Sequence, residues 1–145
     1  MPFRFAMQKV LDYREQLEEE AKVRLAEAER RLQEAQKRLD QLRGELERAA
    51  DRLRDNPLME AGERWLQEQY ITGLRADVAA ASLQERMMDQ MAQEARKLLA
   101  ARAIDKKLLE KLKERQKKHF IRAEQLQEQR FNDETATLRY KAPAF

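Results

Sequence analysis

The 145-residue chain contains no cysteine and only three glycines and three prolines. Without cysteine, neither a disulfide framework nor a thiolate metal site is possible, and this composition fits a reducing compartment. No apolar run approaches the ~20 residues that a membrane-spanning helix requires. The first five residues also lack the continuous apolar stretch of a secretory signal. We therefore expect a cytoplasmic protein that associates with a membrane only peripherally.

Motifs that carry enzyme chemistry are also missing. The glycines Gly44, Gly62 and Gly73 are isolated from one another, so no phosphate-binding loop is formed. His119 is the only histidine, which excludes a metal site built from several histidines. We interpret it as a polar residue tolerated between packed helices. The sequence predicts no catalytic residues, no bound cofactor and no metal site, and hence a protein that is not an enzyme.

Charged residues are what the sequence has in abundance, because Lys, Arg, Asp and Glu make up 39% of the chain. With so few glycines and prolines, this composition is typical of long helices and coiled coils. Between residues 25 and 53, apolar residues recur at alternating intervals of three and four positions: Leu25, Ala28, Leu32, Ala35, Leu39, Leu42, Leu46, Ala49 and Leu53. Such a narrow stripe predicts a helix that packs along one line, the seam, against a second helix.

A break near residue 57 divides the chain into two predicted helices. Pro57 disfavours helical backbone at Asn56, and Gly62 marks a second interruption. Because a short turn makes consecutive helices antiparallel neighbours, we expect an all-α fold, an antiparallel coiled-coil hairpin in a single domain, 1–145. Its predicted parts are a helix at 3–54, a turn at 55–62, a helix at 63–138 and a frayed tail at 139–145.

The two predicted helices differ in length, with the second overhanging the first at its C-terminal end. Pairing between them should end near residue 115, which leaves residues 116–140 without a partner inside the hairpin. This part of the chain carries exposed apolar residues, which indicate a binding partner. The alternatives are that it bends back, frays or forms a dimer.

Charge is unevenly distributed along the chain. Residues 12–20 contain five acidic residues and one basic residue, whereas residues 96–122 contain eleven basic and three acidic residues. Such a basic stretch can meet nucleic acid, anionic lipid or an acidic protein surface. The alternative is a solvated helix face that partly neutralises the acidic start of the first helix. Aromatic residues are too few for stacking on bases, so we expect no nucleic-acid partner.

Three segments together resemble the FliJ family of the flagellar type III export apparatus. Residues 3–14 begin with an aromatic-basic-aromatic triplet and continue as a short amphipathic turn. Residues 65–78 form an aromatic-rich segment just after the predicted turn. Residues 109–128 form a basic stretch, and Asn132-Asp133-Glu134 follow it. The order and spacing of these segments around a central turn carry the resemblance.

The resemblance implies a non-enzymatic stalk in flagellar protein export. Its implied partners are a hexameric export ATPase, whose assembly and activity it promotes, the cytoplasmic domain of the membrane export gate, and export chaperones. It also implies a monomeric hairpin at the inner face of the cell membrane, at the flagellar base. The alternatives are the equivalent stalk of a virulence type III secretion system, a generic coiled-coil adaptor, and a basic helix that binds a charged surface.

The resemblance also selects candidate partner-binding residues. Near the turn, the residues expected to contact the export gate are Leu42, Tyr70, Ile71 and Leu74. At the end with both termini, the residues expected to contact the ATPase are Phe3, Arg14, Arg122, Phe131, Asp133, Glu134 and Arg139. For Leu42 and Leu74, packing in the seam is the competing interpretation. For the charged residues, the competing interpretation is that they are solvated on the helix surface and contact no partner.

Overall fold

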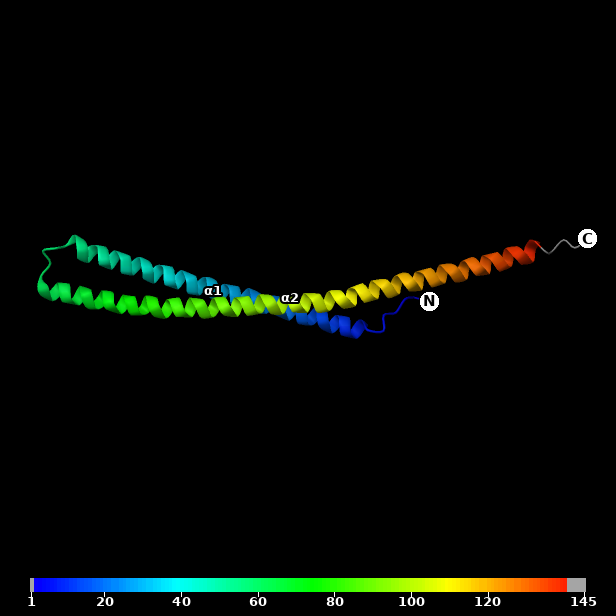
Figure 1. The fold of residues 1–145 in the computed structure, drawn as a ribbon, viewed down its shortest axis with the longest axis horizontal. Helices are drawn as coiled ribbons and strands as arrows, with labels where there is room; N and C mark the ends of the chain where they lie inside the picture. Colours follow the sequence, from blue (N-terminus) through cyan, green and yellow to red (C-terminus); the bar gives the residue numbers. More distant parts are fainter. Residues whose placement is uncertain (1, 141–145) are drawn as a thin grey trace, which may run out of the picture. The chain divides into compact units, whose positions relative to one another are not determined.

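The computed structural model describes residues 2–140, which form two helices, α1 (Gln8–Asp55) and α2 (Ala61–Tyr140). A short turn joins them, and the helices run antiparallel (Figure 1). The prediction of an all-α helical hairpin is therefore confirmed. The chain forms two compact units, which we describe separately. The turn unit is Glu19–Ala100, and the terminal unit comprises residues 2–18 together with residues 101–140. The single-domain organisation stays a prediction.

The core of the turn unit is the predicted seam. Leu42 and Ala49 of α1 form one buried cluster with Ile71 and Leu74 of α2. Partly buried apolar residues pack against this cluster from both helices: Leu46, Leu53, Val78 and Ala81. Burying a leucine or isoleucine side chain contributes about 1.5–3 kcal/mol. The alternating stripe of α1 therefore holds the two helices of this unit together.

The turn that ends α1 depends on Asn56 and Pro57. The Asn56 side-chain Nδ2 donates a hydrogen bond of 2.9 Å to the carbonyl oxygen of Arg52, which satisfies a carbonyl at the end of the helix. Pro57 has no backbone N–H to donate, so the helix cannot continue through it. Polar capping and proline together stop α1 at Asp55, one residue after the predicted boundary.

The second helix begins at Ala61, two residues earlier than predicted. The backbone N–H of Arg64 donates to the carbonyl oxygen of Glu60 at 2.9 Å, so Gly62 lies in the first helical turn. The helix continues to Tyr140. Residues 139 and 140 are therefore helical, and the rest of the predicted frayed tail lies outside the described residues.

In the terminal unit, the start of the chain packs against α2. Phe5 and Leu11 form a buried cluster with Leu109, and Phe3 packs against the edge of this cluster. The ring of Phe3 also lies against the ring of Phe120, with centroids 5.6 Å apart. An aromatic pair at this distance is favourable beyond the burial of its area.

The predicted helix start at residue 3 is wrong, because α1 begins at Gln8. Phe3 and Phe5 both face α2, with the exposed residue Arg4 between them. Residues two apart share a side in an extended chain, whereas in a helix they point in nearly opposite directions. Burying both phenylalanines therefore favours a non-helical segment before α1.

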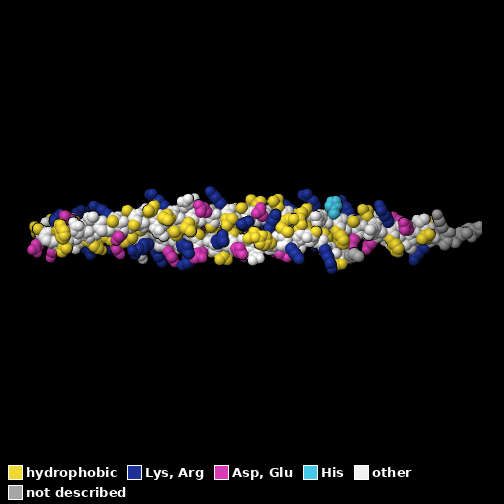
Figure 2. Space-filling view, turned by 90° about the horizontal axis from the view of Figure 1, so that it is seen from below, with side chains coloured by type: hydrophobic (Ala, Val, Ile, Leu, Met, Phe, Trp, Pro, Cys, Tyr) yellow, Lys and Arg dark blue, Asp and Glu magenta, His cyan; other side chains and the backbone are white. Residues whose placement is uncertain are grey.

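This non-helical segment also extends the pairing. An extended chain advances up to about 3.3–3.6 Å per residue, against about 1.5 Å in a helix. Phe3 consequently reaches Phe120, so pairing extends at least about five residues beyond the predicted limit near residue 115. Residues 121–140 of α2, which we call the C-terminal overhang, are all exposed apart from the half-buried Thr135. His119 is exposed, not in the seam, and Figure 2 shows it as the only cyan side chain on the surface.

Candidate functional site

The four residues predicted to contact the gate divide into two kinds. Leu42, Ile71 and Leu74 are each only about 5–6% exposed and belong to the seam core of the turn unit. Tyr70 is 47% exposed. The fold gives the three buried residues a packing role, and Tyr70 is the member of this set that a partner protein can reach directly. Their assignment to the gate stays a prediction.

A groove runs along one side of the seam in the turn unit. Its floor includes Leu42 from α1 with Ala81 and Met88 from α2, and its volume is about 650 Å³. Charged residues of both signs also line it, Arg31, Glu34 and Arg38 from α1 and Asp77 from α2. An apolar floor with charged residues of both signs beside it is the kind of surface against which an amphipathic helix can pack.

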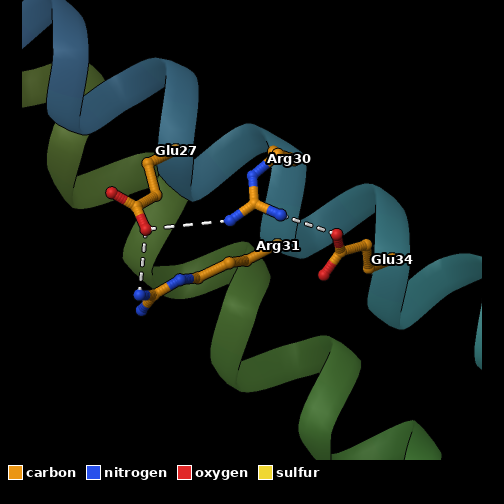
Figure 3. A network of polar contacts seen from close by, with 4 residues as sticks. All are labelled: Glu27, Arg30, Arg31 and Glu34. Carbon is orange, nitrogen blue, oxygen red and sulfur yellow. Dashed lines mark hydrogen bonds and ion pairs between the residues drawn. The ribbon is translucent and has the colours of Figure 1, made fainter.

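Ion pairs on α1 involve some of these lining residues. Arg31 pairs with Glu27 at 3.1 Å, while Arg30 pairs with Glu34 at 2.8 Å and lies 3.8 Å from Glu27 (Figure 3). Exposed pairs of this kind contribute about 0–1 kcal/mol to stability. At the groove, Glu27 places an acidic group beside Arg31.

Large apolar residues near the turn were missed as candidates. Leu58, Trp65 and Leu66 are 98%, 60% and 61% exposed. A sequence signal was available for two of them, because Trp65 and Leu66 belong to the aromatic-rich segment 65–78. A large apolar side chain outside the seam of a two-helix hairpin has nothing to pack against and remains at the surface. The exposed apolar surface near the turn therefore includes more than Tyr70.

Two of the predicted ATPase-binding residues pack inside the terminal unit. Phe3 is half-buried and lies against Phe120. Arg14 is half-buried, and its Nη1 donates a hydrogen bond of 2.7 Å to the backbone carbonyl oxygen of Asp105. Both side chains fasten the beginning of the chain to α2, which gives them a structural role whether or not they touch a partner.

The other five predicted ATPase-binding residues follow Phe120 on α2. They are exposed on α2: Arg122, Phe131, Asp133, Glu134 and Arg139. Phe131 is 69% exposed, and the apolar side chain of Leu138 in the same overhang is 72% exposed. Within residues 2–140, this is a helical segment without a second helix packed against it. Its combination of apolar and charged side chains is available to another protein.

Polar contacts in the terminal unit connect the acidic start of α1 with the basic stretch of α2. Lys106 Nζ lies 2.9 Å from a carboxylate oxygen of Glu18, which is a buried residue. Lys113 Nζ donates a hydrogen bond of 2.7 Å to Oε1 of Gln8. Two lysines of the basic stretch therefore contact the first helix, Lys106 through an ion pair with Glu18 and Lys113 through a hydrogen bond to Gln8. This agrees with the alternative interpretation, in which the basic stretch partly neutralises the acidic start of that helix.

No metal centre or membrane span is found in the part of the chain that the structure describes. Among residues 2–140, no three potential metal-ligating side chains gather in one place. Neither α1 nor α2 is apolar enough over sufficient length to cross a membrane.

Comparison with known proteins gives one match. A family model described as "Flagellar FliJ protein" matches residues 3–144. No protein of curated function and no solved structure matches the chain. The family match covers both helices, the turn between them and the overhang.

Proposed function

Because the chain belongs to the flagellar FliJ protein family, we propose that it is a non-enzymatic coiled-coil stalk of the flagellar type III export apparatus. In this role the chain binds the hexameric export ATPase and promotes its assembly and activity. It also contacts the cytoplasmic domain of the export gate and escorts export chaperones. It works at the inner face of the cell membrane, at the flagellar base. The flagellar family match favours this role over the stalk of a virulence secretion system.

The observation that supports the ATPase contact best is the C-terminal overhang. Its twenty residues extend α2 beyond the ring contact of Phe120 with Phe3. An isolated helix is marginal in water, so a helical segment of this length gains most from packing against a partner. Exposed Phe131 and Leu138 supply apolar anchors, and the charged residues beside them supply contacts that can break and reform.

The test is to purify the chain together with the flagellar export ATPase of the same organism and to measure ATP hydrolysis. We expect stimulation at a low molar ratio of chain to ATPase. The double variant Phe131→Ser/Leu138→Ser should lose most of the stimulation, because it removes both apolar anchors of the overhang. Val23→Ser is the matched control, since Val23 is an exposed apolar residue of α1, 67% exposed, outside the proposed surfaces.

Circular dichroism of each variant establishes that the hairpin remains folded. Two results would contradict the proposal. One is a chain that neither stimulates the ATPase nor retains the ATPase or the gate domain in a pull-down. The other is equal stimulation by the overhang variant and the unmodified chain, which would remove the overhang from the contact.

A further inference from the structure

Five basic residues form a row along one face of α2 in the terminal unit: Lys107, Lys111, Arg115, Lys118 and Arg122. Successive members are three or four residues apart, which keeps them on one side of a helix. Lys118 follows Leu109 by nine residues, or two and a half helical turns. The row therefore lies opposite the face that packs Leu109 against the first segment of the chain.

None of these five side chains is used to hold the hairpin together. All five are exposed, and within residues 2–140 none of them takes part in an ion pair. In contrast, Lys106 pairs with Glu18, and Lys113 binds Gln8, on the side of α2 that faces the first helix. The basic row is thus an unneutralised charge that points away from the fold.

The residues beside the row fit an anionic surface. Ile104 and Ile121, on the same face, are 59% and 44% exposed. By helical spacing, Glu114 is the only acidic residue on this face between residues 104 and 122. At the end of the row, Arg115, Lys118 and Arg122 line a shallow hollow that contains no acidic residue.

We propose that this basic row binds the surface of an anionic phospholipid membrane. A row on one helix face lets the five cations approach a flat surface together, and the two isoleucines can enter its interface. Clusters of four to eight Lys or Arg residues on such a helix are typical of binding to anionic lipid. Nucleic acid fits less well, because Phe120, the aromatic residue in this part of α2, packs on Phe3 and is not available for stacking.

This inference deepens the proposed location at the membrane and rests on it, but it requires no other protein of the export apparatus. Its failure is therefore distinguishable from failure of the ATPase contact, which is measured without lipid. The assay is co-sedimentation of the full chain with vesicles. One set of vesicles contains equal parts phosphatidylglycerol and phosphatidylcholine, and the other contains phosphatidylcholine alone.

We expect binding to the anionic vesicles only, and binding that weakens as salt is added. The triple variant Lys107→Gln/Lys111→Gln/Lys118→Gln should bind the anionic vesicles roughly a hundredfold more weakly. A matched control, Lys37→Gln/Arg52→Gln/Arg75→Gln, removes the same charge from exposed positions of the turn unit and should bind nearly as the unmodified chain does.

Three results would overturn the proposal. The first is no binding to anionic vesicles, or equal binding to both kinds of vesicle. The second is equal weakening by the two triple variants, which would mean that net charge matters and the row does not. The third is tighter binding of duplex DNA or poly-glutamate than of anionic vesicles through the same three lysines, which would assign the row to a nucleic acid or an acidic protein.

Discussion

At the scale of single residues, leucines of the same helix differ in how deeply they are buried, and this should decide what each contributes to stability. Leu74 is 5% exposed and belongs to the core of the turn unit, whereas Leu83 on the same helix is 60% exposed. We expect Leu74→Ala to lower the free energy of unfolding by about 2–4 kcal/mol, because it leaves a cavity between two helices. Leu83→Ala should change it by less than about 0.5 kcal/mol.

Urea unfolding followed by far-ultraviolet circular dichroism measures both values. The two leucines form a matched pair, since the substitution and the helix are the same. Equal effects of the two substitutions would mean that the packing of α1 on α2 is not what stabilises this unit.

A second residue-scale prediction concerns the ion pair between Lys106 and Glu18. The Glu18 side chain is only 8% exposed, so its carboxylate has little water to replace a lost cation. We expect Lys106→Met to destabilise the hairpin by about 3 kcal/mol, and the double variant with Glu18→Met to recover part of this loss. The free energies of unfolding of the single and double variants, measured by thermal and urea unfolding, give the coupling energy between Lys106 and Glu18.

The exposed pair of Arg30 with Glu34 is the control for this measurement. Its side chains are 61% and 64% exposed, so Arg30→Met should cost less than about 1 kcal/mol. If Lys106→Met proves no more costly than Arg30→Met, the buried pair contributes nothing beyond an ordinary surface pair.

At the scale of the elements, Gly44 is a weak point inside α1. Glycine in the middle of a helix costs about 0.5–1 kcal/mol relative to alanine, because it loses more backbone freedom on folding. A Cβ at this position would meet only the end of the Arg48 side chain, at 3.3 Å, and that flexible side chain can move. Gly44→Ala should therefore raise the free energy of unfolding by about 0.5–1 kcal/mol.

Gly73 of α2 provides the comparison, because a Cβ there would meet nothing within 4 Å. Thermal unfolding of Gly44→Ala and Gly73→Ala should show both variants more stable than the unmodified chain. A loss of stability confined to Gly44→Ala would mean that Arg48 cannot move aside.

The C-terminal overhang is the element whose helix has the least support. Residues 121–140 have no second helix against them, whereas Leu109 of the same helix is buried against Phe5 and Leu11. We expect the amide hydrogens of the overhang to exchange much faster than those near Leu109, because few buried contacts oppose local opening. Hydrogen exchange read by mass spectrometry measures this difference.

Addition of the export ATPase should slow exchange in the overhang if this segment is the contact. The first residues of α1 serve as the internal reference, since their protection depends on packing within the hairpin. Protection of the overhang equal to that of residue 109 in the free chain would contradict the expectation.

At the scale of the whole molecule, the two proposed partner contacts use different parts of the chain. Tyr70 belongs to the turn unit and Phe131 to the terminal unit. We expect Tyr70→Ser to weaken binding to the gate domain by about tenfold, a typical loss for an aromatic anchor, and to leave ATPase stimulation unchanged. Phe131→Ser should do the reverse.

Tyr13→Ser is the matched control, because Tyr13 is 59% exposed and outside both surfaces. Affinity for the gate domain and the rate of ATP hydrolysis are measured for all three variants. Loss of both activities in either Tyr70→Ser or Phe131→Ser would show that the two contacts are not separable.

The candidate surfaces were only partly predictable, and Tyr70 with Ile71 shows why. These neighbours lie at the edge of the apolar stripe, and periodicity alone leaves open which of them faces α1. The structure buries Ile71 and leaves Tyr70 exposed. At the terminal unit, an aromatic-basic-aromatic start was visible, but its extended conformation depends on burying Phe3 and Phe5 together against α2. That contact joins residues more than a hundred positions apart, such as Phe3 and Phe120.

The sequence by itself determined the two helices, the turn between them and the seam that pairs them. These features depend on local rules, namely the alternating three and four spacing of apolar residues and the helix-stopping effect of Asn56 and Pro57. Only the tertiary structure decided that pairing reaches Phe120, which charged residues of the basic stretch are neutralised, and which of the neighbours Tyr70 and Ile71 is buried. Each of these depends on what lies opposite a residue on the other helix, and no local pattern contains that information.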